Sequence, residues 1–241
     1  MVGKRLLRKL FRAVTSQYFR VVVEEILQWR HGRVVRNRAL VTRQYRLKPG
    51  VNLDAPTLGR TPEGTVTETP YHVIRSHNWK LITDMLVELG ATRGIALEVG
   101  AGDGTDVRAM RRMLPAISWH GCDLNPRIGN REIIPADAVH LPFRTGTADV
   151  VVTSHVLEQM PDVAPALQEI ARVTKQWLIS VEPDYERGSW MQRLYMIRKD
   201  YVRDIVNPAA AAGFTLVRRE WAYAGNPLNR PSIFVFRKQA P

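Results

Sequence analysis

Apolar and polar positions follow two alternating periods in the second half of the chain. Short apolar runs rich in β-branched residues predict strands at 95–99, 118–122, 131–136, 148–154, 176–182, 214–221 and 232–238. Apolar residues at helical spacing predict helices at 104–114 and 164–173 and a mostly helical segment at 191–212. This alternation predicts an α/β domain with a mostly parallel sheet, and the last two strands predict an antiparallel hairpin at its edge.

The first 70 residues follow a different pattern. Apolar side chains recur at helical spacing within residues 7–22, and basic side chains fill the opposite face, which predicts a basic amphipathic helical arm over 1–48. Residues 49–70 are rich in proline and glycine and are expected to form a linker or surface loop. The main domain is expected to span 71–241 and to open with a capping helix at 71–89, ended by Gly90.

Charge separates the same two regions. Residues 1–60 hold 14 Lys+Arg against 3 Asp+Glu, a net charge of +11. The whole chain carries +12, so residues 61–241 carry only +1. A basic arm on a nearly neutral domain predicts an anionic partner, either a membrane surface or a nucleic acid. Cys122 is the single cysteine, so an internal disulfide is excluded. We expect a cytoplasmic protein, peripheral to a membrane if the arm binds lipid.

A glycine-rich turn carries the first chemical signal. The stretch "ALEVGAGDGTDVRAM" (96–110) passes from a strand through three glycines into a helix. A phosphate-binding P-loop requires a lysine and a hydroxyl residue after the last glycine, but Thr105 and Asp106 follow it. The dinucleotide motif requires a third glycine where Thr105 stands, and Asp103 and Asp106 would crowd a pyrophosphate. The turn therefore suits a ligand without phosphate.

The turn and four later segments resemble one family. "LEVGAGDGT" resembles motif I of the class I S-adenosylmethionine-dependent methyltransferases, and "PADAVHLPF", "ADVVVTSHVLEQMPD", "ALQEIARVTKQWLISVEPD" and "AGFTLVRRE" resemble its later segments in the right order. Together they cover roughly residues 95–220 and are similar to the small-molecule, type 11-like branch. The resemblance implies a Rossmann-like, doubly wound sheet of seven strands and S-adenosyl-L-methionine as the methyl donor.

The resemblance also implies where that donor binds. The residues expected to hold its methionine end are Glu98, Gly100, Ala101, Gly102 and Gly104. Asp123, with Leu124 beside it, is expected to bind the ribose, because a carboxylate accepts hydrogen bonds from both ribose hydroxyls. Asp137 and Ala138 are expected to meet the adenine, and Ser154 lies at the end of the fourth main strand.

His155 is the candidate catalytic base. It follows Ser154 at the strand end where open α/β sheets place ligands, and an imidazole accepts a proton near neutral pH. A structural or cofactor-contacting role is the alternative reading of this histidine. Tyr71 and His72 are expected to cap the acceptor side from the preceding helix, and Tyr185 and Trp190 belong to an aromatic insertion that is expected to line it.

Two departures from the family pattern bear on these roles. "VTKQW" replaces the usual glycine-containing turn before the fifth strand, and Glu158-Gln159 stands where many relatives have Glu-His. Glu182 and Asp184 suggest a metal, but Ser154 occupies the position of the acid that would complete the site, so no metal is expected.

Three functions remain open at this point. The first is methylation, most simply O-methylation, of a small-molecule or lipid-linked acceptor, with the arm on an anionic membrane. The second is RNA methylation, with the arm holding phosphates. The third is cofactor binding without turnover. The arm is also compatible with burial of its apolar stripe in a homodimer.

Overall fold

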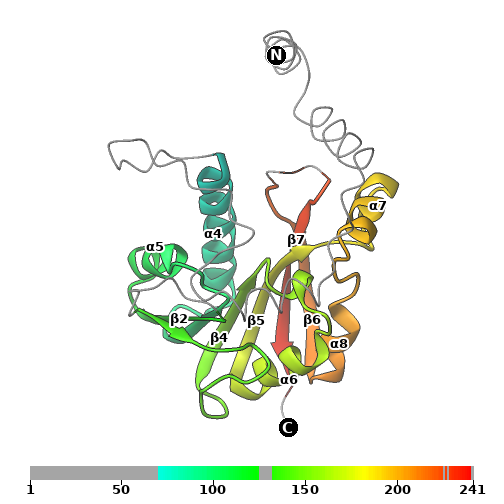
Figure 1. Ribbon diagram of the computed structural model, residues 1–241. Helices are drawn as coiled ribbons and strands as arrows, with labels where there is room; N and C mark the ends of the chain where they lie inside the picture. Colours follow the sequence, from blue (N-terminus) through cyan, green and yellow to red (C-terminus); the bar gives the residue numbers. More distant parts are fainter. Residues whose placement is uncertain (1–69, 125–131, 225, 227, 240–241) are drawn as a thin grey trace, which may run out of the picture.

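The computed structural model describes residues 70–124, 132–224, 226 and 228–239, and within them seven strands form one sheet (Figure 1). The strands are β1 (Gly94–Val99), β2 (Ile117–Asp123), β3 (Ile133–Pro135), β4 (Ala148–Ser154), β5 (Thr174–Pro183), β6 (Phe214–Trp221) and β7 (Pro231–Lys238). The helices are α4 (Pro70–Glu88), α5 (Thr105–Met113), α6 (Ala164–Val173), α7 (Trp190–Arg198) and α8 (Val206–Ala211), with a short 3-10 helix η1 (Leu157–Gln159).

The sheet has the order β3-β2-β1-β4-β5-β7-β6. β1 to β5 are parallel, whereas β7 lies antiparallel between β5 and β6. The predicted α/β class, the mostly parallel sheet and the antiparallel hairpin are therefore confirmed. The strand order reverses between β1 and β4, and such a switch point opens a crevice at the carboxyl ends of the strands.

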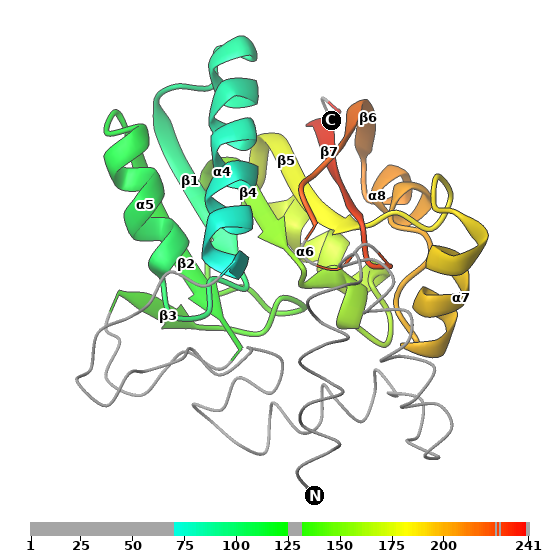
Figure 2. The same cartoon turned by 90° about the horizontal axis from the view of Figure 1, so that it is seen from above.

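Helices cover both faces of the sheet (Figure 2). On one face α4 and α5 pack on the sheet, with Trp79 of α4 edge-on to Trp119 of β2 at 6.2 Å between ring centroids. On the other face α6 and α8 cover Val151 and Leu178. Successive residues of a strand point to opposite faces, so Val150 and Val152 belong to the first layer and Val151 to the second.

The segment 191–212, expected to be mostly helical, splits into α7 and α8. Asp200 adopts a left-handed φ of 54°, and the amide of Tyr201 donates to the carbonyl of Met196, which ends α7. The Asp204 carboxylate then accepts from the amide of Val206 at 2.8 Å and starts α8. The helical pattern is real, but these two end signals interrupt it.

The "VTKQW" departure has a simple structural outcome. α6 ends at Val173 and β5 begins at Thr174, so no residue separates helix from strand. The Thr174 hydroxyl donates to the carbonyl of Ile170 at 2.6 Å, which satisfies an acceptor in the last turn of the helix.

The N-terminal predictions fall mostly outside the described residues. The arm (1–48) and the linker lie there, except Pro70, which is the first residue of α4. The capping helix expected at 71–89 corresponds to α4 within one residue at each end. Within the described ranges, every helix is too short or too polar to cross a bilayer.

Candidate functional site

The glycine turn connects β1 to α5 through three left-handed residues. Gly100, Gly102 and Gly104 have φ values of 82°, 56° and 74°, which residues with a Cβ adopt only with strain. A Cβ on Gly100 would lie 2.1 Å from Cγ2 of Val156, so only glycine lets β1 and the segment after β4 approach. A Cβ on Gly102 would meet nothing within 4 Å. The turn is therefore packed on one side and open at Gly102.

The end of β2 supports this turn. The amides of Gly100 and Ala101 both donate to the carbonyl of Cys122, at 2.8 and 3.0 Å. The amide of Gly102 donates to Oδ2 of Asp123 at 2.8 Å. The predicted ribose carboxylate therefore lies directly beside the predicted methionine-binding turn, and Leu124 follows it, half-buried.

The segment of Asp137 is attached to the same strand end. The amide of Ala136 donates to the carbonyl of Asp123 at 2.9 Å, and Oδ1 of Asp137 accepts from the amide of Val139 at 3.2 Å. Ala138 is buried. The predicted ribose-side acid thus ends β2, and the predicted adenine-side acid follows the adjacent strand β3.

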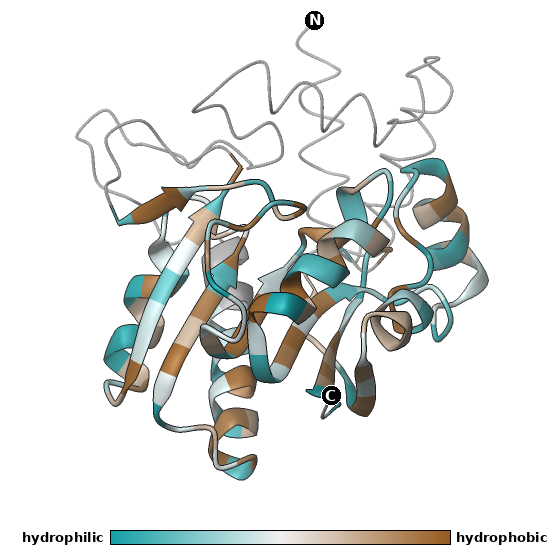
Figure 3. Cartoon of the chain, turned by 90° about the horizontal axis from the view of Figure 1, so that it is seen from below, coloured by the Kyte–Doolittle hydropathy of each residue, from teal (hydrophilic) through white to brown (hydrophobic). Residues whose placement is uncertain are grey.

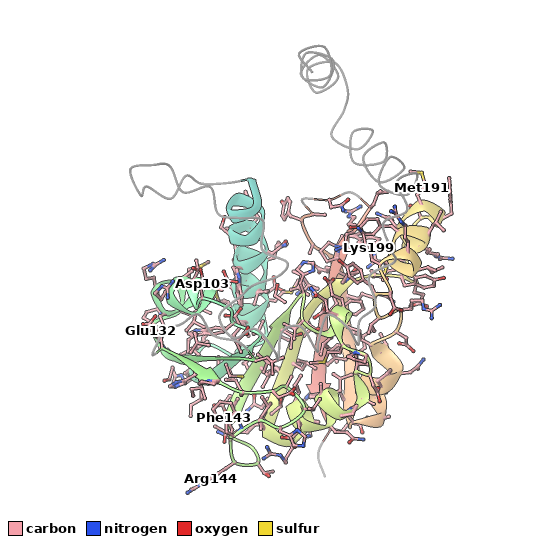
Figure 4. The ribbon with its side chains drawn as sticks, in the orientation of Figure 1. Asp103, Glu132, Phe143, Arg144, Met191 and Lys199 are labelled. Carbon is pink, nitrogen blue, oxygen red and sulfur yellow. The ribbon has the colours of Figure 1, made fainter. Side chains whose placement is uncertain are left out.

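Two side chains of α6 hold this segment from below, and the sequence predictions missed them. Arg172 donates to the carbonyls of Phe143 and Leu141, at 2.8 and 3.0 Å, while Glu169 accepts from the amide of Leu141 at 3.0 Å. The Arg172 guanidinium lowers the pKa of Glu169 to about 2. The Glu-x-x-Arg spacing in "LQEIARV" was the available signal, since residues three apart share a helix face. Figure 4 shows Phe143 and Arg144 on this segment.

Glu98, Ser154 and Cys122 lie at the carboxyl ends of β1, β4 and β2. Glu98 is buried and pairs in register with Val152 of β4. Ser154, half-buried, is the last residue of β4. Burial, with the negative charges of Asp123 and Glu98, raises the pKa of the Cys122 thiol to about 12. The thiol is therefore protonated at neutral pH and is no nucleophile.

His155 is held in an unusual conformation just after β4. Its φ is 56°, a left-handed backbone that is costly for a residue with a Cβ and that recurs at functional sites. Its ring Nδ1 lies 3.1 Å from Oε2 of Glu158, which is buried, whereas the His155 side chain is 32% exposed. A carboxylate accepts from Nδ1–H, and that tautomer directs the lone pair of Nε2 away from Glu158.

A second buried carboxylate fixes this turn. Oε1 of Glu182 accepts from the amides of Val156 and Leu157, at 3.1 and 3.0 Å, and Oε2 accepts from the amide of Glu158 at 3.0 Å. Glu182 therefore satisfies the free amides at the start of η1. Burial and the nearby negative charge of Glu158 raise the pKa of Glu182 to about 7.

These contacts show what the two acids considered for a metal do instead. Both oxygens of Glu182 are engaged by backbone amides, and Asp184 accepts from Arg219 and, at 2.6 Å, from the Ser232 hydroxyl. Across the described part of the chain, no group of three or more His, Cys, Asp or Glu side chains could hold a metal ion.

The predicted acceptor-side residues are spread over two elements. Tyr71 and His72 belong to the first turn of α4, and α4 leads into β1, so this turn lies at the edge where β1 ends. Tyr185 is half-buried beneath the guanidinium of Arg193, at 5.7 Å from its ring centroid, whereas Trp190 is 73% exposed at the start of α7. The structure brings the donor-side residues together but leaves Trp190 outside that group.

Comparisons with known proteins agree with this geometry. Residues 97–177 match the family model described as a methyltransferase domain. No curated protein sequence gives a significant match. Among solved structures, the N-methyltransferase NodS from Bradyrhizobium japonicum WM9, in complex with S-adenosyl-L-homocysteine, is 16% identical with a TM-score of 0.57, over 82% of this chain and 98% of that chain.

Two further structures widen the comparison. Magnesium protoporphyrin IX methyltransferase from Synechocystis PCC 6803, with bound S-adenosylhomocysteine, is 14% identical with a TM-score of 0.55, over 73% of this chain and 90% of that chain. The [4+2]-cyclase SpnF is 16% identical with a TM-score of 0.50, over 67% and 82%. At these identities the structures establish the fold, and the family model establishes its type. The chain thus carries a methyltransferase domain with the class I fold, the architecture of the S-adenosylmethionine-dependent methyltransferases.

Proposed function

We propose that the protein transfers a methyl group from S-adenosyl-L-methionine to a hydroxyl of a small-molecule or lipid-linked acceptor, with His155 as the base. One observation carries the assignment of the base. His155 is a strained, carboxylate-oriented histidine that lies at the carboxyl end of β4, and the next residue, Val156, packs against the glycine turn. Backbone strain of this kind recurs at functional sites, and here it is combined with a buried carboxylate that orients the ring.

The residues at the glycine turn fit the donor. Gly102 opens the turn where a side chain would otherwise stand, and its amide fixes the carboxylate of Asp123 beside it. Asp123 is proposed to bind the ribose, Asp137 and Ala138 the adenine, and Glu98 with the turn glycines, Ala101 and Ser154 the methionine end. When bound, the donor supplies a methyl group already activated on a positively charged sulfur.

The chain's own work is alignment and proton transfer. An acceptor hydroxyl within hydrogen-bond reach of Nε2 of His155 would pass its proton to the ring as the methyl group is transferred. Glu158, on Nδ1, would stabilise the imidazolium that forms. Such a base contributes about 10²–10⁴-fold, and alignment of the reactants contributes about 7–11 kcal/mol.

Glu182 keeps the base in place. Three amides of the turn that carries His155 donate to the buried carboxylate of Glu182, which belongs to β5. Both β4 and β5 therefore determine where the His155 ring lies. Precise placement is needed because a displacement of about 1 Å can lower the rate about 100-fold.

The acceptor is proposed to enter between the first turn of α4 and the β5–α7 connection. Tyr185 lies on the second of these segments and would supply an aromatic lining, and Tyr71 and His72, in the first turn of α4, stay candidate acceptor contacts whose side chains lie outside the described part of the chain. The basic arm, residues 1–48, is proposed to hold the protein peripherally on an anionic membrane, on the cytoplasmic side. RNA methylation is the alternative, because the +11 charge of residues 1–60 also suits phosphates.

Two measurements test this proposal. Calorimetry of the full chain should show binding of S-adenosylhomocysteine, and heat with NAD or ATP but none with this ligand would overturn the assignment of the donor. Purified protein with the radiolabelled donor should then methylate lipid or small-molecule extracts rather than RNA.

A variant tests the role of the base. His155→Gln should lower the rate of methyl transfer at least about 100-fold and should change the affinity for S-adenosylhomocysteine by no more than about threefold. His140→Gln, on the segment after Asp137, is the matched control, and an equal loss in both variants would contradict the role of His155.

A further inference from the structure

An apolar ridge runs along the outward face of α7. Trp190, Leu194 and Ile197 are 73%, 57% and 47% exposed. Their spacing of four and three residues places them on one side of the helix. Figure 3 shows hydrophobic segments on α7 interrupted by hydrophilic ones, and Figure 4 shows Met191, near the start of the helix, at the periphery of the molecule. Three large apolar side chains in a row on one helix form an exposed patch that calls for a partner.

The helix that carries this ridge is firmly built on its other side. Ser189 and Gln192 form a reciprocal capping box at its start. Met196 is buried, and the Tyr195 hydroxyl accepts from the side chain of Asn226 at 3.1 Å. The ridge is therefore a preorganised surface of the fold.

Basic side chains border the ridge. In a helix with 3.6 residues per turn, Arg193 and Arg198 lie on opposite flanks of the line through Trp190, Leu194 and Ile197. Residues 185–203 include five basic side chains, Arg187, Arg193, Arg198, Lys199 and Arg203, against two acidic ones, Glu186 and Asp200. Glu186 is already paired with Arg219 at 2.6 Å. The outward surface of α7 is thus apolar at its centre and positive at its margins.

We propose that the α7 ridge docks onto the interface of an anionic lipid bilayer. Trp190 would lie at the headgroup level with Leu194 and Ile197 inserted beside it, and Arg193 and Arg198 would contact lipid phosphates. Charge complementarity selects this occupant. Residues 1–60 carry +11, and a second copy would present the same basic flanks, so like charge disfavours both the chain's own arm and a symmetric dimer as occupants.

This contact explains the position of the aromatic insertion. The β5–α7 connection borders the carboxyl edge of the sheet, where His155 and Glu182 lie. A protein docked through α7 presents this edge near the bilayer, so an acceptor embedded in lipid reaches it without crossing water. The lipid origin of the acceptor rests on the proposed methyl transfer, whereas docking of the ridge does not.

The test uses the full chain and sucrose-loaded vesicles, either of phosphatidylcholine alone or with phosphatidylglycerol added. Trp190→Ser/Leu194→Ser/Ile197→Ser should lower the apparent affinity for the anionic vesicles at least about tenfold, and Arg193→Glu/Arg198→Glu should do the same. The matched control is Val87→Ser/Val217→Ser, because these side chains are 54% and 48% exposed on α4 and β6. The control should bind like the wild type.

A second readout locates the contact. In a Trp29→Phe background, which removes the tryptophan of the arm, brominated acyl chains should quench the tryptophan fluorescence, and adding Trp190→Phe should remove most of that quenching. Wild-type vesicle affinity in both ridge variants, or undiminished quenching in Trp190→Phe, would overturn the proposal. A wild-type dimer in size-exclusion chromatography that the triple serine variant converts to a monomer would do the same, because it would assign the ridge to a second copy. All these outcomes are independent of methyl transfer.

Discussion

The two halves of the sheet edge are held in place by different means. On the β1–β2 side, the donor turn is shaped by backbone, with three left-handed glycines and main-chain bonds to Cys122. On the β4–β5 side, the turn of His155 is shaped by the buried side chains of Glu158 and Glu182. The first half should therefore respond to added volume and should be nearly indifferent to pH. The second half should respond to charge.

Gly100→Ala is expected to have the largest effect. The new Cβ would lie 2.1 Å from Val156 at a φ of 82°, so overpacking and backbone strain should together lower the free energy of unfolding by about 3 kcal/mol. The affinity for S-adenosylhomocysteine, measured by calorimetry, should fall more than about 100-fold. Gly90→Ala is the control, because Gly90 has a φ of 69° but a Cβ added there would meet no atom within 4 Å.

A compensating variant sharpens this prediction. Gly100→Ala/Val156→Ala removes the atom that the new Cβ meets and should recover part of the stability and affinity. If the double variant were no better than Gly100→Ala, the contact between the two halves would not be the cause.

Glu182→Ala should be nearly as destabilising. It would leave the amides of Val156, Leu157 and Glu158 without their acceptor, and buried donors without a partner cost about 1–3 kcal/mol each. Chemical denaturation should show a loss of about 2–3 kcal/mol, because the Val156 amide is only partly buried. Glu220→Ala removes a half-exposed acid of β6 that pairs with Arg218, and it should change stability by less than about 1 kcal/mol. Equal losses in the two variants would contradict the role given to Glu182.

The same carboxyl should give the charge-sensitive half a pH signature. The pKa of Glu182 is raised from 4.5 to about 7 in the folded protein, so the fold retains a proton that the unfolded chain has lost. The contribution of Glu182 to the free energy of unfolding should therefore be largest below about pH 4.5. It should fall as pH rises to about 7, by about 1–3 kcal/mol.

Denaturation of wild type and Glu182→Gln at pH 5, 6, 7 and 8 isolates this contribution. The free energy of unfolding of the wild type minus that of Glu182→Gln should decrease from pH 5 to pH 7 and level off by pH 8. A difference that is flat from pH 5 to pH 8 would show that Glu182 titrates outside the window.

Glu158→Gln should have the smallest of these effects and should act on the rate. An amide in place of the carboxylate cannot stabilise a charged His155 ring, and its NH₂ group favours the wrong tautomer. We expect kcat to fall about tenfold or more, with the KM for the donor unchanged and the pH–rate profile displaced. Gln159→Ala, the neighbour of Glu158 in η1, should leave the profile as in the wild type.

The fold and the donor-side half followed from local patterns. The sequence predicts the strand and helix periods and the glycine turn between them, because each depends on residues close together in the chain. The site roles given to Asp123 and Asp137 remain predictions, although both lie where the family pattern would place them. Local signals also explain the split of the segment 191–212, since Asp200 takes the left-handed conformation that ends α7 and Asp204 is an ordinary helix-start residue.

The acceptor-side half of the site is much harder to predict from the sequence. The bonds from Glu182 to Val156 and Leu157 span 26 and 25 residues, so no local period reports them. The sequence therefore suggests a metal ligand at Glu182 and only a departure from the family pattern at Glu158. In the structure Glu158 contacts the His155 ring, and Glu182 binds the amides of the turn that follows it. The left-handed backbone of His155 has no sequence signal either, because it is imposed by contacts from β5.

The contact between Gly100 and Val156 has a consequence for how the two substrates are handled. Because a glycine hydrogen is all that fits between the donor turn and the turn of His155, neither can shift without displacing the other. Under the proposed function, binding of the donor would therefore be expected to set the position of the His155 turn before the acceptor binds, and an ordered binding sequence would follow.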